Sequence, residues 1–140
     1  MIRYKIEAWN MHEVSIALAI VDEISERATR DGIKKITAVY LKVGKLTAVD
    51  ETALKFAWDL TTDGTPASGS SLCIEHVPLT IYCKQCGCER IIIEGALPVC
   101  PDCATPSNEI TRGRELLITA MEVFDAAESG RYPTEHFAQE

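Results

Sequence analysis

The chain has 140 residues, the commonest size of a single domain, so we expect one main core with a small added module. Its formal net charge of -7 argues against a nucleic-acid partner, because affinity for a phosphate backbone comes largely from clustered Lys and Arg. Without a long apolar run or a secretory signal, the sequence predicts a soluble protein of the cytoplasm with no membrane segment. In that reducing compartment, paired cysteines indicate metal binding more often than disulfides.

The first half of the chain is predicted to contain two helices and one strand. Apolar residues recur at helical spacing over 14–30, and Gly32 ends this helix. Apolar and β-branched residues over 36–43 predict a strand that ends at Gly44. A second helix is expected to begin at Asp50, whose carboxylate can cap the free N–H groups. The residues expected on its buried face are Leu54, Ala57 and Trp58.

The second half is predicted to contain strands around a cysteine-rich segment. A strand is expected over 72–79, after a loop of small and turn-forming residues. Residues 82–105 enclose one short predicted strand, 90–94, and have too few apolar residues to fold without a cross-link. Strand character resumes over 115–123, and the tail that follows is polar without a period.

This order of elements predicts an α+β fold in which a small sheet of about three strands packs with two helices. The cysteine-rich segment is then a zinc-ribbon module inserted before the last strand returns to the sheet. We expect the main domain to combine residues 11–80 with 106–124, and the zinc-ribbon domain to cover 81–105. Residues 1–10 are an N-terminal extension, and residues 125–140 are a polar tail.

Two Cys-x-x-Cys motifs, thirteen residues apart, predict a zinc site made by Cys83, Cys86, Cys100 and Cys103. Two residues between cysteines let a tight turn aim both sulfurs at one ion. Because four thiolates leave no coordination position for water or substrate, the expected role of this zinc is structural. A pair of disulfides or a rubredoxin-like iron site is the competing interpretation. Cys73 is expected to be a buried free thiol, and Cys88 a spare thiol or a substitute ligand.

The segment Met-His-Glu at residues 11–13 means little alone, because a lone His12 at a helix start is most often a solvated surface residue. It is informative together with other segments, because MHEVSIALAIVD, VGKLTAVD, CKQC with CPDC, and GRELLITAMEV occur in this order. The set resembles the HypA/HybF family of hydrogenase nickel-incorporation proteins. The resemblance runs from Met11 to about Val123 and so covers nearly the whole chain.

The resemblance implies a nickel metallochaperone and not an enzyme. It implies a HypB-type GTPase partner, with which nickel is loaded into the large subunit of nickel–iron hydrogenase. In the family the Met-His-Glu motif binds nickel, which carries over to Met11, His12 and Glu13, with Asp50 as a matching carboxylate whose alternative role is the helix cap. A free terminal amine, two amide nitrogens and the His12 ring would suit square-planar nickel(II).

Ten residues precede Met11, so in the full chain its nitrogen is an amide that must lose a proton before it binds metal.

The alternative function is a zinc-ribbon module that binds nucleic acid or another protein. Against nucleic acid, residues 83–103 carry only Lys84 and Arg90 beside three acidic residues. An enzyme has least support, because no nucleophile, base or phosphate loop is evident. The sequence leaves open whether the chain forms a homodimer or a transient complex. It also leaves open whether the metal goes to a hydrogenase or to urease.

Overall fold

The computed structural model describes residues 13–124 and the backbone of 129–133. The predicted ligands Met11 and His12, the extension 1–10 and the rest of the tail lie outside the described residues. Two compact units are present, and the second is formed by Lys42–Ala48 together with His76–Leu116. No helix in the described part of the chain is both long and apolar enough to cross a membrane.

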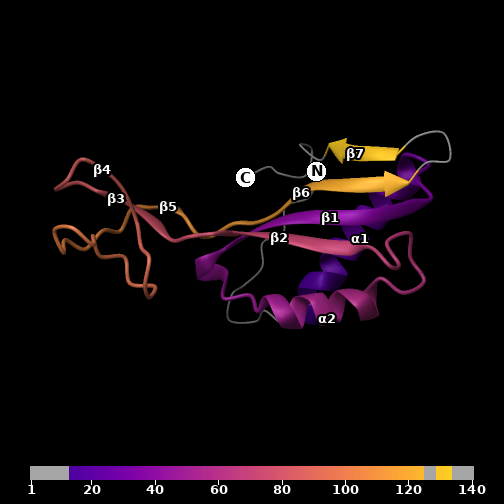
Figure 1. Ribbon diagram of the computed structural model, residues 1–140, viewed down its shortest axis with the longest axis horizontal. Helices are drawn as coiled ribbons and strands as arrows, with labels where there is room; N and C mark the ends of the chain where they lie inside the picture. The colour runs from indigo at the N-terminus through magenta and orange to yellow at the C-terminus, as the bar shows by residue number, and fades with distance from the viewer. Residues whose placement is uncertain (1–12, 125–128, 134–140) are drawn as a thin grey trace. The chain divides into compact units, whose positions relative to one another are not determined.

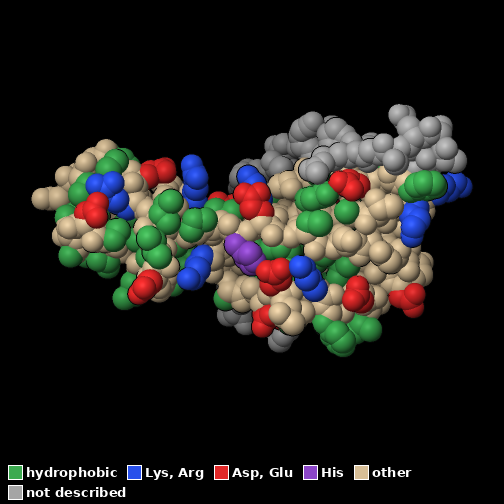
Figure 2. Space-filling model, viewed as in Figure 1, with side chains coloured by type: hydrophobic (Ala, Val, Ile, Leu, Met, Phe, Trp, Pro, Cys, Tyr) green, Lys and Arg blue, Asp and Glu red, His purple; other side chains and the backbone are tan. Residues whose placement is uncertain are grey.

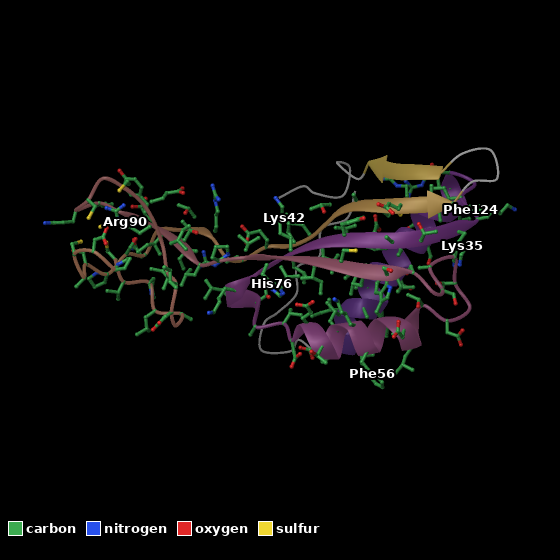
Figure 3. All side chains as sticks on the ribbon, in the orientation of Figure 1. Lys35, Lys42, Phe56, His76, Arg90 and Phe124 are labelled. Carbon is green, nitrogen blue, oxygen red and sulfur yellow. The ribbon has the colours of Figure 1, made fainter. Side chains whose placement is uncertain are left out.

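Two helices pack against each other in the first unit, α1 (Glu13–Arg30) and α2 (Glu51–Thr61). The predicted start of the second helix is confirmed, because Asp50 is the N-cap and its Oδ1 accepts a hydrogen bond from the Ala53 N–H at 3.1 Å. The predicted buried face is also confirmed, since Leu54, Ala57 and Trp58 are all buried. On the outer side of α2, hydrophobic side chains are exposed (Figure 2), and Phe56 points away from the sheet (Figure 3).

The main sheet has the strand order β2-β1-β6-β7, with β1 at Lys35–Gly44, β2 at Ser71–Val77, β6 at Leu116–Phe124 and β7 at Ser129–Pro133. The first two strands run in the same direction and β6 runs opposite to them (Figure 1), so the sheet is mixed. β6 lies beside β1, which confirms that the last predicted strand returns to the sheet. β7 pairs antiparallel with β6 at the edge of the sheet, in a tail for which no element is predicted. A short edge strand is defined by this backbone pairing, so it needs no apolar period in its sequence.

A separate antiparallel sheet of three strands, in the order β4-β3-β5, forms the second unit. Its strands are β3 (Thr80–Cys83), β4 (Cys88–Ile91) and β5 (Ile110–Arg112). The strand predicted over 72–79 is confirmed as β2 but ends earlier than expected, because β2 stops at Val77 and the chain enters the other sheet at Thr80. Pro78 has no N–H to donate to a ladder, which accounts for the break. The strand predicted over 90–94 is wrong in its bounds, because the strand in this region is β4 at Cys88–Ile91. Cys88 pairs with Cys83 at the turn, and this pairing sets where β4 begins.

Two segments of the second unit, one at Gly44 and the other at Gly113, approach each other closely through their backbones. The Gly44 N–H donates to the Glu115 carbonyl, and the Leu46 N–H donates to the Gly113 carbonyl, each at 2.7 Å. A Cβ on Gly44 would lie 2.2 Å from the carbonyl carbon of Gly113, so a side chain at Gly44 does not fit. This close approach holds the end of β1 against the segment just before β6. Leu46 belongs to η2 (Lys45–Thr47), so one of these two hydrogen bonds joins η2 to Gly113.

Trp58 is expected to be a main determinant of the stability of the first unit. Its side chain is 1% exposed, and its Nε1 donates to Ser70 Oγ at 2.9 Å. The change Trp58→Ala should therefore lower the free energy of unfolding by about 3–5 kcal/mol. The control Phe56→Ala on the same helix, where the side chain is 68% exposed, should change it by less than about 0.5 kcal/mol. Urea unfolding followed by fluorescence and circular dichroism measures both, and equal losses would contradict the assignment of the core.

Candidate metal centre

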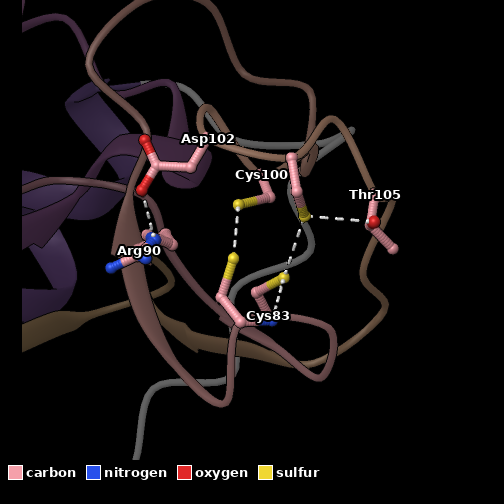
Figure 4. A network of polar contacts seen from close by, with 7 residues as sticks. Cys83, Arg90, Cys100, Asp102 and Thr105 are labelled. Carbon is pink, nitrogen blue, oxygen red and sulfur yellow. Dashed lines mark hydrogen bonds and ion pairs between the residues drawn. The ribbon is translucent and has the colours of Figure 1, made fainter.

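The four cysteines of the two Cys-x-x-Cys motifs come together in the second unit, with all four sulfurs within 4.8 Å of one another. Cys83 Sγ lies 3.5 Å from Cys103 Sγ, and Cys86 Sγ lies 3.9 Å from Cys100 Sγ (Figure 4). Each close pair joins one sulfur of the first motif to one of the second. The cluster therefore links the end of β3 to a loop that lies about twenty residues later in the chain.

The two motifs form turns of the same kind. After the first motif, the Gly87 N–H donates to the Cys83 carbonyl at 2.7 Å, and after the second the Ala104 N–H donates to the Cys100 carbonyl at 2.9 Å. Both residues that close a turn have a left-handed backbone, with φ of 74° at Gly87 and 63° at Ala104. Glycine adopts this conformation without strain, whereas alanine is rarely found there. The second turn keeps its shape despite that cost, which indicates that the position of its sulfurs is imposed by the rest of the unit.

The sulfur positions fit a tetrahedral ion. A zinc–thiolate bond of about 2.3 Å places the sulfurs of a regular tetrahedron about 3.8 Å apart, and the two close pairs lie on either side of this value. Cys83 and Cys100 are buried, and all six cysteines of the chain are free thiols. Four soft donors at these separations match zinc, and no fifth donor of the described residues belongs to the cluster.

The groups around the cluster shift the pKa values of its thiols in opposite directions. The Thr105 hydroxyl, 3.1 Å from Cys103 Sγ, is the main cause that lowers the pKa of Cys103 to about 6. The sulfur of Cys103 and, after it, burial raise the pKa of Cys86 to about 12. Since a metal needs all four thiolates, binding should release protons from the cluster at neutral pH.

Arg90 supplies the positive charge next to the cluster. Its Nε lies 2.9 Å from Asp102 Oδ2 (Figure 4), and Arg90 acts to lower the pKa of Cys86 against the larger effects that raise it. Four thiolates around one divalent ion carry a net charge of about -2, which a neighbouring guanidinium partly offsets. Neither Arg90 nor Thr105 is predicted from the sequence to belong to this site. The Cys-x-x-Cys spacing carries no signal for them, because both reach the sulfurs only through the pairing of β3 with β4 and the fold of the second turn.

A second polar arrangement lies in the first unit, where the amino ends of the two helices meet. Glu13 is the first residue of α1, and its Oε2 accepts a hydrogen bond from the Asp50 backbone N–H at 3.0 Å. Asp50 in turn caps α2 through its own carboxylate. The structure thus brings together two of the four predicted nickel-site residues, and each has one carboxylate oxygen bound to a backbone N–H. The other two, Met11 and His12, precede Glu13 directly in the sequence and lie outside the described residues.

These features define a class of small metal-binding proteins in which an α+β unit is joined to a zinc-ribbon-like unit with four thiols. Residues 11–123 match the family model described as "Hydrogenase/urease nickel incorporation, metallochaperone, hypA". The chain belongs to this HypA family of metallochaperones, whose members carry metal and do not catalyse a reaction. The resemblance of the sequence to this family is therefore confirmed.

Curated relatives match over nearly their whole length. The hydrogenase maturation factor HypA of Chloroflexus aurantiacus is 40% identical over 112 residues, which are 80% of this chain and 98% of the relative. HypA of Desulfosudis oleivorans is 44% identical over 115 residues, covering 81% of this chain and 98% of the relative. Among solved structures, the solution structure of the Ni metallochaperone HypA from Helicobacter pylori has a TM-score of 0.57 at 23% identity. It covers 81% of this chain and 98% of that one, and at this identity it supports the fold alone.

The purified protein is expected to carry one zinc ion per chain, held by the four clustered cysteines. The change Cys100→Ser should remove the zinc and unfold the second unit, because a three-thiol set loses both the ion and a buried core residue. Cys88→Ser is the matched control, since Cys88 lies on β4 in the same unit but outside the cluster, and it should keep the zinc. Metal analysis by mass spectrometry and proteolysis of the second unit measure the two effects. A fully folded second unit without metal would contradict the assignment.

Proposed function

We propose that this chain binds nickel(II) as cargo at residues 11–13 and delivers it during maturation of nickel–iron hydrogenase. The observation that supports this site is the meeting of the two helix amino ends at Glu13 and Asp50, next in sequence to His12. Membership in the HypA family supports the choice of metal. The nickel donors are then the His12 ring and the backbone nitrogens of residues 11–13.

The hydrogen bonds at the helix ends favour nitrogen donors over carboxylates. Helix amino ends carry partial positive charge, which disfavours a cation unless negative groups offset it. The Glu13 Oε2 and the Asp50 Oδ1 each accept a backbone N–H, and so offset this charge while they hold the two helices together. Glu13 therefore serves nickel through its backbone nitrogen, and its carboxylate acts with Asp50 to position the segment. Four nitrogens in one short segment give the square-planar arrangement that nickel(II) accepts and zinc does not prefer.

The zinc ion that we assign to Cys83, Cys86, Cys100 and Cys103 has a structural role, because the thiols fill all four positions around it. The zinc and nickel sites thus differ in donor type, sulfur for one and nitrogen for the other. We further propose the reducing cytoplasm as the location, which suits six free thiols, and a GTPase as the partner. Energy for metal transfer would come from that partner, since the sequence carries no phosphate-binding loop of its own.

Replacement of the imidazole tests the nickel site directly. The change His12→Ala should abolish high-affinity nickel binding and leave the zinc content and the unfolding transition unchanged, because it removes one cargo donor and no core residue. His76→Ala is the control, because His76 is an exposed residue of the second unit. This variant should bind nickel with the same affinity as the unchanged protein. Isothermal titration with nickel, with zinc quantified in parallel, measures both. Undiminished nickel binding by His12→Ala would exclude this site.

The ten residues before Met11 provide a test of the amine donor. A chain that begins at Met11 should bind nickel more tightly at neutral pH than the full chain, because a free amine binds metal more readily than an amide that must first lose a proton. The visible spectrum of the shorter form should be that of square-planar nickel(II). Equal affinity and equal spectra for the two forms would show that the nitrogen of Met11 is not a donor.

A further inference from the structure

A fifth thiol lies in the second unit beside the cysteine cluster. Cys88 begins β4 and is half-buried, and it is not one of the four sulfurs that lie within 4.8 Å of one another. In the β3–β4 ladder Cys88 stands directly opposite Cys83, which is a member of the cluster. Directly paired residues of an antiparallel ladder point to the same side, with Cβ atoms about 4.5–5.5 Å apart. The Cys88 side chain therefore lies on the side of the sheet that carries Cys83.

The side of β4 that carries Cys88 also reaches the second Cys-x-x-Cys motif. Arg90 lies two residues after Cys88 on the strand, so the two side chains point the same way. The Arg90 Nε lies 2.9 Å from Oδ2 of Asp102 (Figure 4), a residue between the two cysteines of that motif. Cys88 thus has one member of the thiol set opposite it, and its neighbour on the same side of the strand contacts the motif that supplies two others.

Among the thiols of the first motif, Cys86 is the one that can leave an ion without disturbing the rest of the site. Cys86 is exposed, whereas Cys83 and Cys100 are buried in the core of the unit. Backbone groups hold the turn around Cys83, because the Cys86 N–H lies 3.4 Å from Cys83 Sγ and the Gly87 N–H donates to the Cys83 carbonyl at 2.7 Å. Neither bond uses the Cys86 side chain, so its sulfur can move away while Cys83 stays in place.

Cys88 can reach the position of a zinc ligand through rotation of its side chain. Neighbouring sulfurs of a tetrahedral zinc site are about 3.8 Å apart. Two Cβ atoms about 5 Å apart let their sulfurs reach this separation when the side chains rotate between staggered positions. Of the six cysteines in the chain, the one that remains is Cys73, which lies on β2 in the first unit. Cys88 is therefore the thiol that the second unit holds in reserve.

We propose that Cys88 is an alternative zinc ligand, which replaces Cys86 when that thiol leaves the ion. The exchange conserves the four-thiolate set and its charge, because Cys88 loses a proton as it binds and Cys86 takes one up as it leaves. The second unit then keeps its ion, and with it its fold, when its exposed thiol is lost. The proposal rests on the assignment of zinc to the four cysteines and does not depend on nickel binding.

The change Cys86→Ser tests the exchange in the zinc-loaded full chain. This variant should keep one zinc ion per chain, because Cys88 completes the thiol set, and its Kd for zinc should rise by less than about tenfold. The double variant Cys86→Ser/Cys88→Ser has no replacement thiol, so its Kd should rise at least about a thousandfold. Cys103→Ser is the matched control, since Cys103 has the equivalent position in the second motif, and it should lose zinc as the double variant does.

Two measurements follow these variants. Competition with a chromophoric chelator gives Kd for zinc. Cobalt(II), bound in place of zinc, reports the ligand set through its visible absorption, because thiolate and oxygen donors give different spectra. The cobalt form of Cys86→Ser should have the spectrum of a tetrahedral ion with four thiolates, whereas the spectrum of the double variant should show fewer.

The rate of zinc release provides a second test in a variant that retains all four original ligands. Cys88→Ser should keep its zinc but pass it to an excess of chelator at least about tenfold faster than the unchanged protein, because no thiol recaptures the ion when Cys86 dissociates. Cys73→Ser removes a free thiol from the first unit and is the control, so its release rate should be unchanged.

Three outcomes would overturn the proposal: equal loss of zinc in Cys86→Ser and Cys103→Ser, full retention of zinc by the double variant, or equal release rates for Cys88→Ser and the unchanged protein. Zinc content of the unchanged protein separates this failure from a failure of the zinc assignment. An unchanged protein without zinc would contradict the assignment itself, whereas a zinc-loaded protein with any of the three outcomes would contradict the exchange alone.

Discussion

The second unit depends on its four cysteine sulfurs, because the unit has too little apolar surface to fold without them. Its buried cluster contains Leu79, Ile81, Cys83, Ile92 and Cys100, so two of the five core side chains are also members of the thiol set. A core of this size rarely stabilises a fold in the absence of a cross-link or a metal. The sulfurs therefore act as core and as ligand set at once, and the register of β3 with β4 follows from where the first motif turns.

The two metal sites that we propose differ in where their donors lie along the chain. In the small sheet the donors come from two turns nearly twenty residues apart, so release of an ion would require the unit to open. The donors that we propose for nickel lie at residues 11–13, a short segment that ends at the first residue of α1, where Glu13 meets Asp50. Loss of nickel from such a segment leaves the helices and the sheet unchanged.

Sequence patterns predict those parts of the structure that depend on local periodicity or on fixed spacing. The two helices, the Asp50 cap, strands β1 and β6 and the meeting of the four cysteines follow from such patterns. The split at Pro78 and the strands β5 and β7 do not, because strands this short are defined by hydrogen bonds to segments distant in the sequence. For the same reason Arg90 and Thr105 are recognised beside the sulfurs only in the structure.

The four cysteines also set which residues of the small sheet face its core. Ile81 packs with Cys83 and Cys100, and its partners Arg90 and Ile110 across the strands share its face, because directly paired residues point the same way. An ion held by the four thiols would keep this register of the strands in place.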